Sequence, residues 1–246
     1  MTLLRRSITI TCLFLGALLL VGTSQAQTHS PVAEQLAKTY GLDSFGQIEA
    51  IRYTFNLQLP ALNVNLSRTW VWEPKTGQVT YEGKDKDGKP VNISYVRSQI
   101  NSAPANVKDE IEPNFVNDNY WVIFPFHVYW DTSANVEEKD NQKLPLGKGT
   151  AKLVSVKYPM EVGGYTPGDT WDLYVGSDGR VEQFIYHRGG PKKPSNVTTT
   201  WAGYKKAGPL LVSTDHRGTA DGKPARIIFS NVAVKLGGSD SWVDAQ

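Results

Sequence analysis

The feature that most constrains this chain is a change of hydrophobic period near residue 47. From there on, apolar and polar side chains alternate: Ile51, Tyr53 and Phe55 would face one way, and Arg52 and Thr54 the other. A period of two is typical of a strand with one buried face. The chain must therefore build a β-sheet with one apolar side.

Further strand-like segments follow, separated by turn residues. A strand over Val64–Glu73 leads through the turn Pro74–Gly77 into a strand over Gln78–Glu82, and Asp87 with Gly88 marks the next reversal. Strands joined in sequence by tight turns form an antiparallel meander. We expect the remaining strands over Val91–Val96, Trp121–Trp130, Thr150–Tyr158, Thr170–Val175, Val181–His187, Asn196–Tyr204, Leu210–Thr214 and Ala225–Val234.

Two segments with helical spacing accompany these strands. The first is predicted from Pro31, after a capping Ser30, to a stop at Gly41. The second is predicted over Pro104–Glu112 and should be ended or kinked by Pro113. The predicted fold class is mainly β (α+β): a curved antiparallel sheet or half-open β-barrel of about ten strands with two or three covering helices.

The N-terminus has the organisation of a secretory signal peptide. Arg5 and Arg6 precede an apolar run of about 14 residues, and a small-x-small cleavage site ends at Ala26. Such a run is shorter than the roughly 20 residues that cross a bilayer. We predict cleavage after Ala26, no transmembrane span in the mature protein, and a single β-rich domain over residues 27–246 in the periplasm or the medium.

Cysteine and charge exclude several classes of protein. Cleavage removes Cys12, the only cysteine, and so excludes disulfides, thiolate metal ligands and cysteine nucleophiles. The chain has 26 basic and 24 acidic residues, and two of the basic ones, Arg5 and Arg6, lie in the signal peptide. A nearly neutral mature protein gives no indication of nucleic-acid binding.

Motifs for catalysis and cofactors fail on inspection. The segment Gly83–Pro90 approaches a phosphate-binding loop, but Pro90 stands where a Ser or Thr is required. The four histidines are scattered without metal-ligand spacing. His216 follows Asp215, and neighbours on a strand point to opposite faces, so the pair cannot form part of a catalytic triad. We therefore predict no catalytic residues, no metal and no cofactor.

The aromatic content is high, with seven Trp, 11 Tyr and eight Phe residues. One interpretation is a core that compensates for the absence of disulfides, because each aromatic side chain buries about 150 to 250 Å². The other is a concave sheet whose aromatic face lines a cavity for a lipid or acyl chain. The candidate cavity residues are Trp70, Trp72, Trp121 and Phe124.

Two segments carry a resemblance to a known group of proteins. The run Phe115–Pro125 and the run Gly163–Asp169, with Trp171–Val175 after it, resemble segments of uncharacterised secreted bacterial proteins. Those proteins look like distant relatives of the outer-membrane lipoprotein carriers LolA and LolB. The resemblance implies a half-open barrel with helices over its mouth and an apolar cavity, and it transfers no functional residue to this sequence.

These observations leave three functions open. The leading hypothesis is a periplasmic, non-enzymatic binding or carrier protein for a lipid or other apolar ligand. The second is a structural or interaction module of the cell envelope that binds a protein partner and no small molecule. The third is an enzyme whose site is assembled from dispersed strands.

Overall fold

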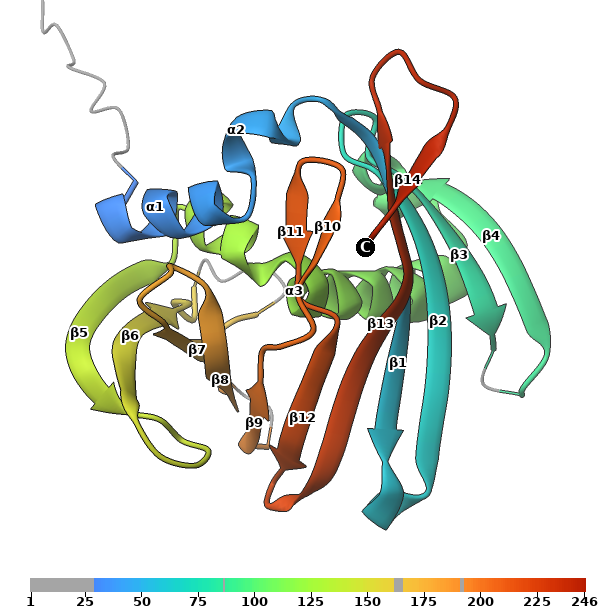
Figure 1. The fold of residues 1–246 in the computed structure, drawn as a ribbon. Helices are drawn as coiled ribbons and strands as arrows, with labels where there is room; N and C mark the ends of the chain where they lie inside the picture. Colours follow the sequence, from blue (N-terminus) through green and yellow to red (C-terminus); the bar gives the residue numbers. More distant parts are fainter. Residues whose placement is uncertain (1–28, 86, 162–165, 191–192) are drawn as a thin grey trace, which may run out of the picture.

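The computed structural model describes residues 29–85, 87–161, 166–190 and 193–246. The predicted signal peptide and the predicted cleavage after Ala26 lie outside these residues. The described residues form one large antiparallel sheet of 12 strands, a separate two-stranded hairpin and a few helices (Figure 1). The predicted fold class, a curved antiparallel sheet with few helices, is confirmed.

The regular elements have the following bounds. The helices are α1 (Pro31–Thr39), α2 (Leu42–Phe45) and α3 (Glu112–Trp130), with short 3₁₀ turns at Pro60–Leu62 and Arg97–Ser102. The strands are β1 (Ile48–Leu59), β2 (Val64–Glu73), β3 (Gln78–Lys84), β4 (Pro90–Val96), β5 (Asn135–Lys143), β6 (Thr150–Lys157), β7 (Thr170–Val175), β8 (Val181–Arg188), β9 (Ser195–Thr200), β10 (Lys205–Ala207), β11 (Leu210–Val212), β12 (Asp215–Ala220), β13 (Lys223–Leu236) and β14 (Trp242–Asp244).

The order of strands in the sheet joins two meanders. The order is β4-β3-β2-β1-β13-β12-β9-β8-β7-β6-β5, and β14 pairs with the end of β13. The two meanders meet where the long strands β1 and β13 pair antiparallel, so the last long strand of the chain lies beside the first. The two outer strands, β4 and β5, do not pair with each other along this path, and the sheet therefore remains open.

The first helix has the predicted bounds. Ser30 is the N-cap of α1 and Pro31 is its first residue, although the Ser30 side chain makes no capping hydrogen bond. Gly41 follows the helix with φ of 105°, and a Cβ there would lie 2.5 Å from the carbonyl oxygen of Pro209. Only glycine suits this position, because its backbone is left-handed and the neighbouring chain is close.

The prediction for residues 104–130 is wrong in two respects. A π-helical turn at Val107–Ile111 continues directly into α3, and Pro113 lies in the first turn of that helix instead of ending it. Proline is tolerated there because the first helical N–H groups have no partner within the helix. The segment Trp121–Trp130, predicted as a strand, is the second half of α3. The helix is kinked at Ile123, two residues before Pro125.

The reason for the error is that α3 is buried on nearly every side. It crosses one face of the sheet, here called the inner face, and the curved sheet wraps around it (Figure 1). Twelve of its 19 residues are buried. A helix with apolar residues all round has no amphipathic period, and a short apolar run of this kind does not distinguish a helix from a buried strand. Within the described residues, no helix is long and apolar enough to span a membrane.

His216 contributes to the core of the sheet. Its ring is fully buried, stacks on Trp201 with centroids 4.3 Å apart, and places Nε2 3.1 Å from the Ser213 hydroxyl. Asp215 points the other way and accepts hydrogen bonds from Arg217 and Arg226, both at 2.8 Å. The predicted opposition of this pair is confirmed. Burial lowers the pKa of His216 to about 3.

The buried histidine predicts a pH dependence of stability. Between about pH 6 and pH 4 the unfolded chain protonates His216 and the folded protein does not, so the free energy of unfolding falls as the pH falls. The slope attributable to one such group approaches 1.4 kcal/mol per pH unit. We expect His216→Phe to remove this component. Urea unfolding at several pH values measures the free energy of unfolding of both proteins. If it falls equally with pH in both, His216 is not the cause.

Candidate functional site

The structure brings the four candidate residues to the inner face in two groups, one on each side of α3. Trp70 and Trp72 lie on β2 and pack against Phe115 of α3, with ring centroids 5.5 and 6.1 Å apart. Trp121 and Phe124 lie on α3 itself and pack on the other side of the helix. All four side chains are buried.

The second group packs against β7. Trp171 lies 4.8 Å from Trp121 and is stacked on Phe124 at 4.1 Å between ring centroids. Phe184 of β8 completes this layer, 5.2 Å from Trp121. Aromatic contacts in these geometries add about 0.5 to 1.5 kcal/mol each beyond the area they bury. The two groups together hold α3 between the halves of the sheet.

A cleft opens beside the second group, between α3 and strands β7 and β8. We call it the aromatic cleft; its volume is about 330 Å³. Among the four candidates, Trp121 lines it, whereas the other three lie behind its walls or across α3. The lining residues are Pro113, Asn114, Val116, Asn117, Tyr120, Trp121, Thr166, Asp169, Trp171 and Tyr186.

A few polar groups are placed among these aromatic walls. Asp169 accepts hydrogen bonds from the Tyr186 hydroxyl at 2.9 Å and from the Gly189 amide at 2.8 Å. Burial and the neighbouring Asp169 raise the pKa of Tyr186, which keeps that hydroxyl neutral. The indole Nε1 of Trp171 is buried and has no hydrogen-bond partner within the described part of the chain. The cleft thus combines aromatic surface with the polar side chains of Asp169 and Tyr186.

A buried ion pair ties the first half of α3 to the sheet. Arg68 of β2 donates to both carboxylate oxygens of Asp118, at 2.7 and 2.6 Å, and to the Asn114 side chain at 3.1 Å. The Trp70 indole also donates to Asp118, at 2.8 Å. Burial raises the pKa of Asp118, while Arg68 opposes this shift. The carboxylate therefore depends on Arg68 to remain ionised.

A second polar tie holds the end of α3. Asp131 accepts hydrogen bonds from the hydroxyls of Tyr120 and Tyr158, at 2.6 and 2.8 Å, and lies 3.4 Å from His127. Although burial raises the pKa of Asp131, the bonds from His127 and the tyrosines outweigh it, and the pKa is lowered. These groups position the helix, and Tyr120 is the one that also lines the aromatic cleft.

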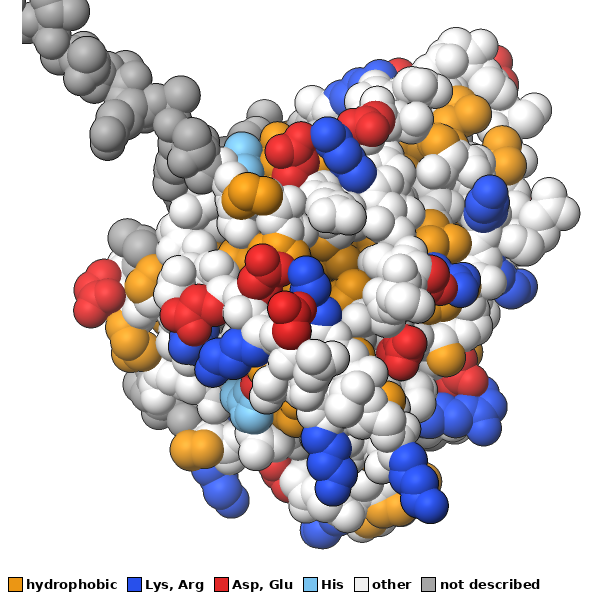
Figure 2. Space-filling view, turned by 60° about the vertical axis from the view of Figure 1, so that its left-hand side comes forward, with side chains coloured by type: hydrophobic (Ala, Val, Ile, Leu, Met, Phe, Trp, Pro, Cys, Tyr) orange, Lys and Arg blue, Asp and Glu red, His pale blue; other side chains and the backbone are white. Residues whose placement is uncertain are grey.

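A different hollow lies under α1, on the side of the molecule shown in Figure 2. Its volume is about 560 Å³, and its apolar lining comes from Val32 and Leu36 of α1 and from Ala151, Val154 and Val175 of the sheet. Figure 2 shows hydrophobic side chains gathered in the middle of this face with charged side chains around them. We call this hollow the α1 groove.

Comparison with known proteins finds similarity of fold only. No family model matches the sequence, and no curated protein matches it significantly. The structure is similar to a DUF1329 family protein from Desulfovibrio piger, with 10% identity and a TM-score of 0.43 over 85% of this chain and 94% of that one. It is also similar to a LolA superfamily protein from Nitrosomonas europaea, with 8% identity and a TM-score of 0.44 over 84% of this chain and 94% of that one.

The sequence predicted an apolar cavity but not the place of this cleft, and one candidate, Trp121, is among its lining residues. Trp121 and Trp171 also fall within the two stretches that carry the resemblance, of which residues 163–165 lie outside the described residues. Trp171 and Tyr186 were not among the candidates. Their alternation with polar residues on β7 and β8 predicts burial, but it does not show that α3 leaves space beside them.

The Arg68–Asp118 pair predicts a specific pattern of stability. Asp118→Asn leaves the nearly buried guanidinium without its carboxylate and should lower the free energy of unfolding by about 3 to 5 kcal/mol. Replacement of both partners, as Arg68→Met with Asp118→Leu, should recover most of that loss because neither buried charge remains. Denaturant unfolding of the three proteins checks this. A double variant no more stable than Asp118→Asn would contradict it.

Proposed function

We propose that this protein is an exported, non-enzymatic binding or carrier protein that holds a lipid or other apolar ligand between its curved sheet and α3. The aromatic cleft is the observation that carries the proposal. Its volume of about 330 Å³ falls in the range of roughly 300 to 1,000 Å³ that is usual for small-molecule sites. Its walls combine aromatic rings with polar side chains such as Asn117 and Asp169, and aromatic walls with placed polar groups are usual for such sites.

The four candidate residues have different proposed parts in this site. Trp121 contacts the ligand in the cleft, and Phe124 supports the opposite wall through its stacking on Trp171. Trp70 stacks on Tyr81, with centroids 4.6 Å apart, and Tyr81 lines a hollow of about 840 Å³ on the other side of α3. Trp72 supports the same side through its contacts with Phe45 and Phe115.

An apolar ligand needs no reactive group to bind at such a site. Each buried methylene of an acyl chain contributes about 0.8 kcal/mol, so ten of them contribute roughly 8 kcal/mol before the costs of association. The two hollows beside α3 share Asn114 in their linings, and a ligand that entered one would therefore lie close to the other. A single chain along α3 is the arrangement we favour.

The proposed location follows from the signal sequence. A protein carried across the inner membrane meets lipids, lipidated proteins and envelope proteins, and an apolar ligand there needs shielding from water. We propose the periplasm or the medium as the place of action, with a lipid or acyl chain as the ligand. An envelope protein that delivers or receives the ligand is the second kind of partner.

The alternative is an interaction module of the envelope that binds no small molecule. The α1 groove favours it, because apolar side chains of Val32, Leu36 and Val175 line a hollow that is open at the surface. Exposed apolar surface rimmed by polar residues is typical of protein interaction sites. The two functions differ in whether the purified protein carries an apolar molecule.

The first experiment is native mass spectrometry of the mature protein purified from its own cell envelope, followed by organic extraction of what it releases. The carrier proposal predicts a stoichiometric lipid or acyl compound. A protein that carries none, and whose tryptophan fluorescence is unchanged when fatty acids and phospholipids are added, would support the interaction module instead.

A matched pair of variants tests whether the cleft is the site. Asn117 is exposed at the mouth of the aromatic cleft, and Asn117→Phe places a ring in the space that a ligand would fill. We expect at least a tenfold loss of affinity for a fatty acid in a fluorescence titration. Lys108→Phe, an exposed position just before α3, should bind like the unchanged protein. Equal affinity in both variants would exclude the cleft.

A further inference from the structure

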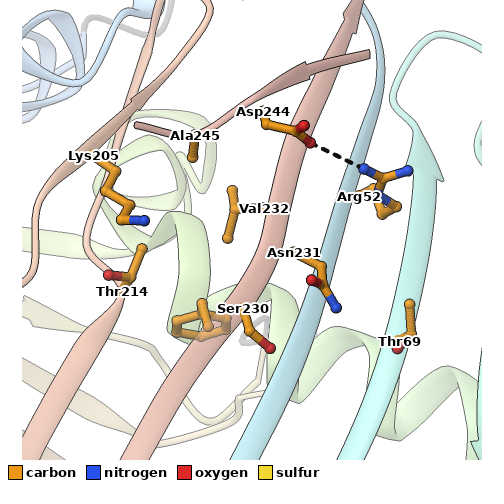
Figure 3. A pocket seen from close by; sticks show the side chains of 10 residues that line it. Arg52, Thr69, Lys205, Thr214, Ser230, Asn231, Val232, Asp244 and Ala245 are labelled. Atoms are coloured by element: carbon orange, nitrogen blue, oxygen red, sulfur yellow. Dashed lines mark hydrogen bonds and ion pairs between the residues drawn. The ribbon is translucent and has the colours of Figure 1, made fainter.

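A polar hollow lies on the face of the sheet opposite α3. Arg52 and Thr69, which line it, alternate along β1 and β2 with the buried residues Tyr53 and Trp70, so they point outward. We call it the outer hollow; its volume is about 600 Å³. Figure 3 shows the side chains that line it: Arg52, Thr69, Lys205, Thr214, Phe229, Ser230, Asn231, Val232, Asp244 and Ala245.

The hollow forms where β13 is bulged. Arg52 pairs with Ala233 and Thr54 with Ser230, so two residues of β13, Asn231 and Val232, stand opposite a single residue of β1. Asn231 has φ of 53°, a left-handed conformation that few residues adopt within a strand. Bulges of this kind redirect side chains and are frequent beside binding sites. Here the bulge turns the end of β13 toward β14.

Two cations face this hollow with hydrogen-bonding capacity to spare. Arg52 donates one hydrogen bond, from Nη2 to Asp244 at 3.2 Å, and its guanidinium lies 4.8 Å from the centre of the Trp242 ring. Its Nε also has no hydrogen-bond partner within the described residues, but this atom is buried and out of a ligand's reach. Across the hollow, the described residues offer the Lys205 ammonium no carboxylate within ion-pair distance.

The remaining groups add donors and one opposing charge. The Ser230 hydroxyl accepts a hydrogen bond from Asn56 at 3.1 Å, which leaves its own hydrogen available. Among the described residues, the Asn231 side chain makes one long hydrogen bond, 3.4 Å, to Thr54. Asp244 is the one acidic side chain in the lining, and it is 79% exposed. Water therefore screens its attraction for Arg52 strongly.

We propose that the outer hollow binds a small molecule through a phosphate or carboxylate group, which Arg52 and Lys205 hold from two sides. A guanidinium offers two parallel donors to an oxyanion, and an ammonium adds a compact positive charge. The oxyanion takes the place of Asp244 at Arg52. A volume of about 600 Å³ exceeds that of the anion and leaves room for the rest of the molecule.

This site is independent of the proposed lipid site, because it lies on the other face of the sheet. The proposal predicts opposite effects of the basic and acidic residues around the hollow on anion binding. Lys205 and Arg52 attract the anion, and Asp244 competes with it. Loss of a cation should weaken binding, whereas loss of the competing carboxylate should strengthen it.

The test is titration of the mature protein with inorganic phosphate and with acetate at low ionic strength, followed through the assigned indole N–H resonance of Trp242. We expect saturable binding that weakens about tenfold in Lys205→Met and in Arg52→Met. Asp244→Asn should bind more tightly, by about threefold. Lys206→Met, at the next exposed position and outside the hollow, is the matched control and should bind like the unchanged protein.

The anion with the lower dissociation constant, phosphate or acetate, shows which oxyanion class the hollow prefers. Weaker binding at higher salt is expected for both. The proposal is overturned if neither anion shifts the Trp242 resonance in a saturable way. It is also overturned if Lys205→Met and Lys206→Met bind alike, since general attraction to surface charge would then explain the binding.

Discussion

The structure depends on the burial of one helix, α3, that is covered on nearly every side. A helix such as α3 cannot lie on a flat sheet, because half of its apolar surface would remain in water. The sheet therefore curves around it, with β2 contributing Trp70 on one side and β7 contributing Trp171 on the other. The position of the aromatic cleft and of the polar ties at Asp118 and Asp131 follows from this arrangement.

The polar side chains of α3 then have to be satisfied inside the protein. Asp118 lies within α3 and Asp131 directly follows its last residue, and the two accept hydrogen bonds from Arg68 of β2 and from Tyr120 and Tyr158. Such pairs contribute little net stability compared with apolar residues of the same size, but they tolerate only one register of the helix. The aromatic contacts provide most of the free energy that holds α3 on the sheet, and the carboxylates determine its register.

Strands and turns were largely predictable from the sequence, whereas the central helix was not. The observed bounds of β2 and β7, Val64–Glu73 and Thr170–Val175, are those predicted, because alternation and turn residues act locally. The second half of α3 was assigned to a strand because its burial depends on strands far away in the sequence. For the site, one candidate residue, Trp121, lines the aromatic cleft, but the sequence did not indicate that a cleft lies between α3 and strands β7 and β8. The outer hollow had no signal, since it depends on a bulge and on the pairing of β13 with β14.

The open sheet also leaves two strands with a free edge, and one of them, β5, is rich in charged residues. The outermost strand β5 reads Asn-Val-Glu-Glu-Lys-Asp-Asn-Gln-Lys, and its pairing with β6 is interrupted between Lys139 and Gln142. Alternating charges and an irregular backbone prevent another strand from adding to such an edge. A chain that keeps its barrel open can therefore expose this strand to a crowded compartment without polymerising through it.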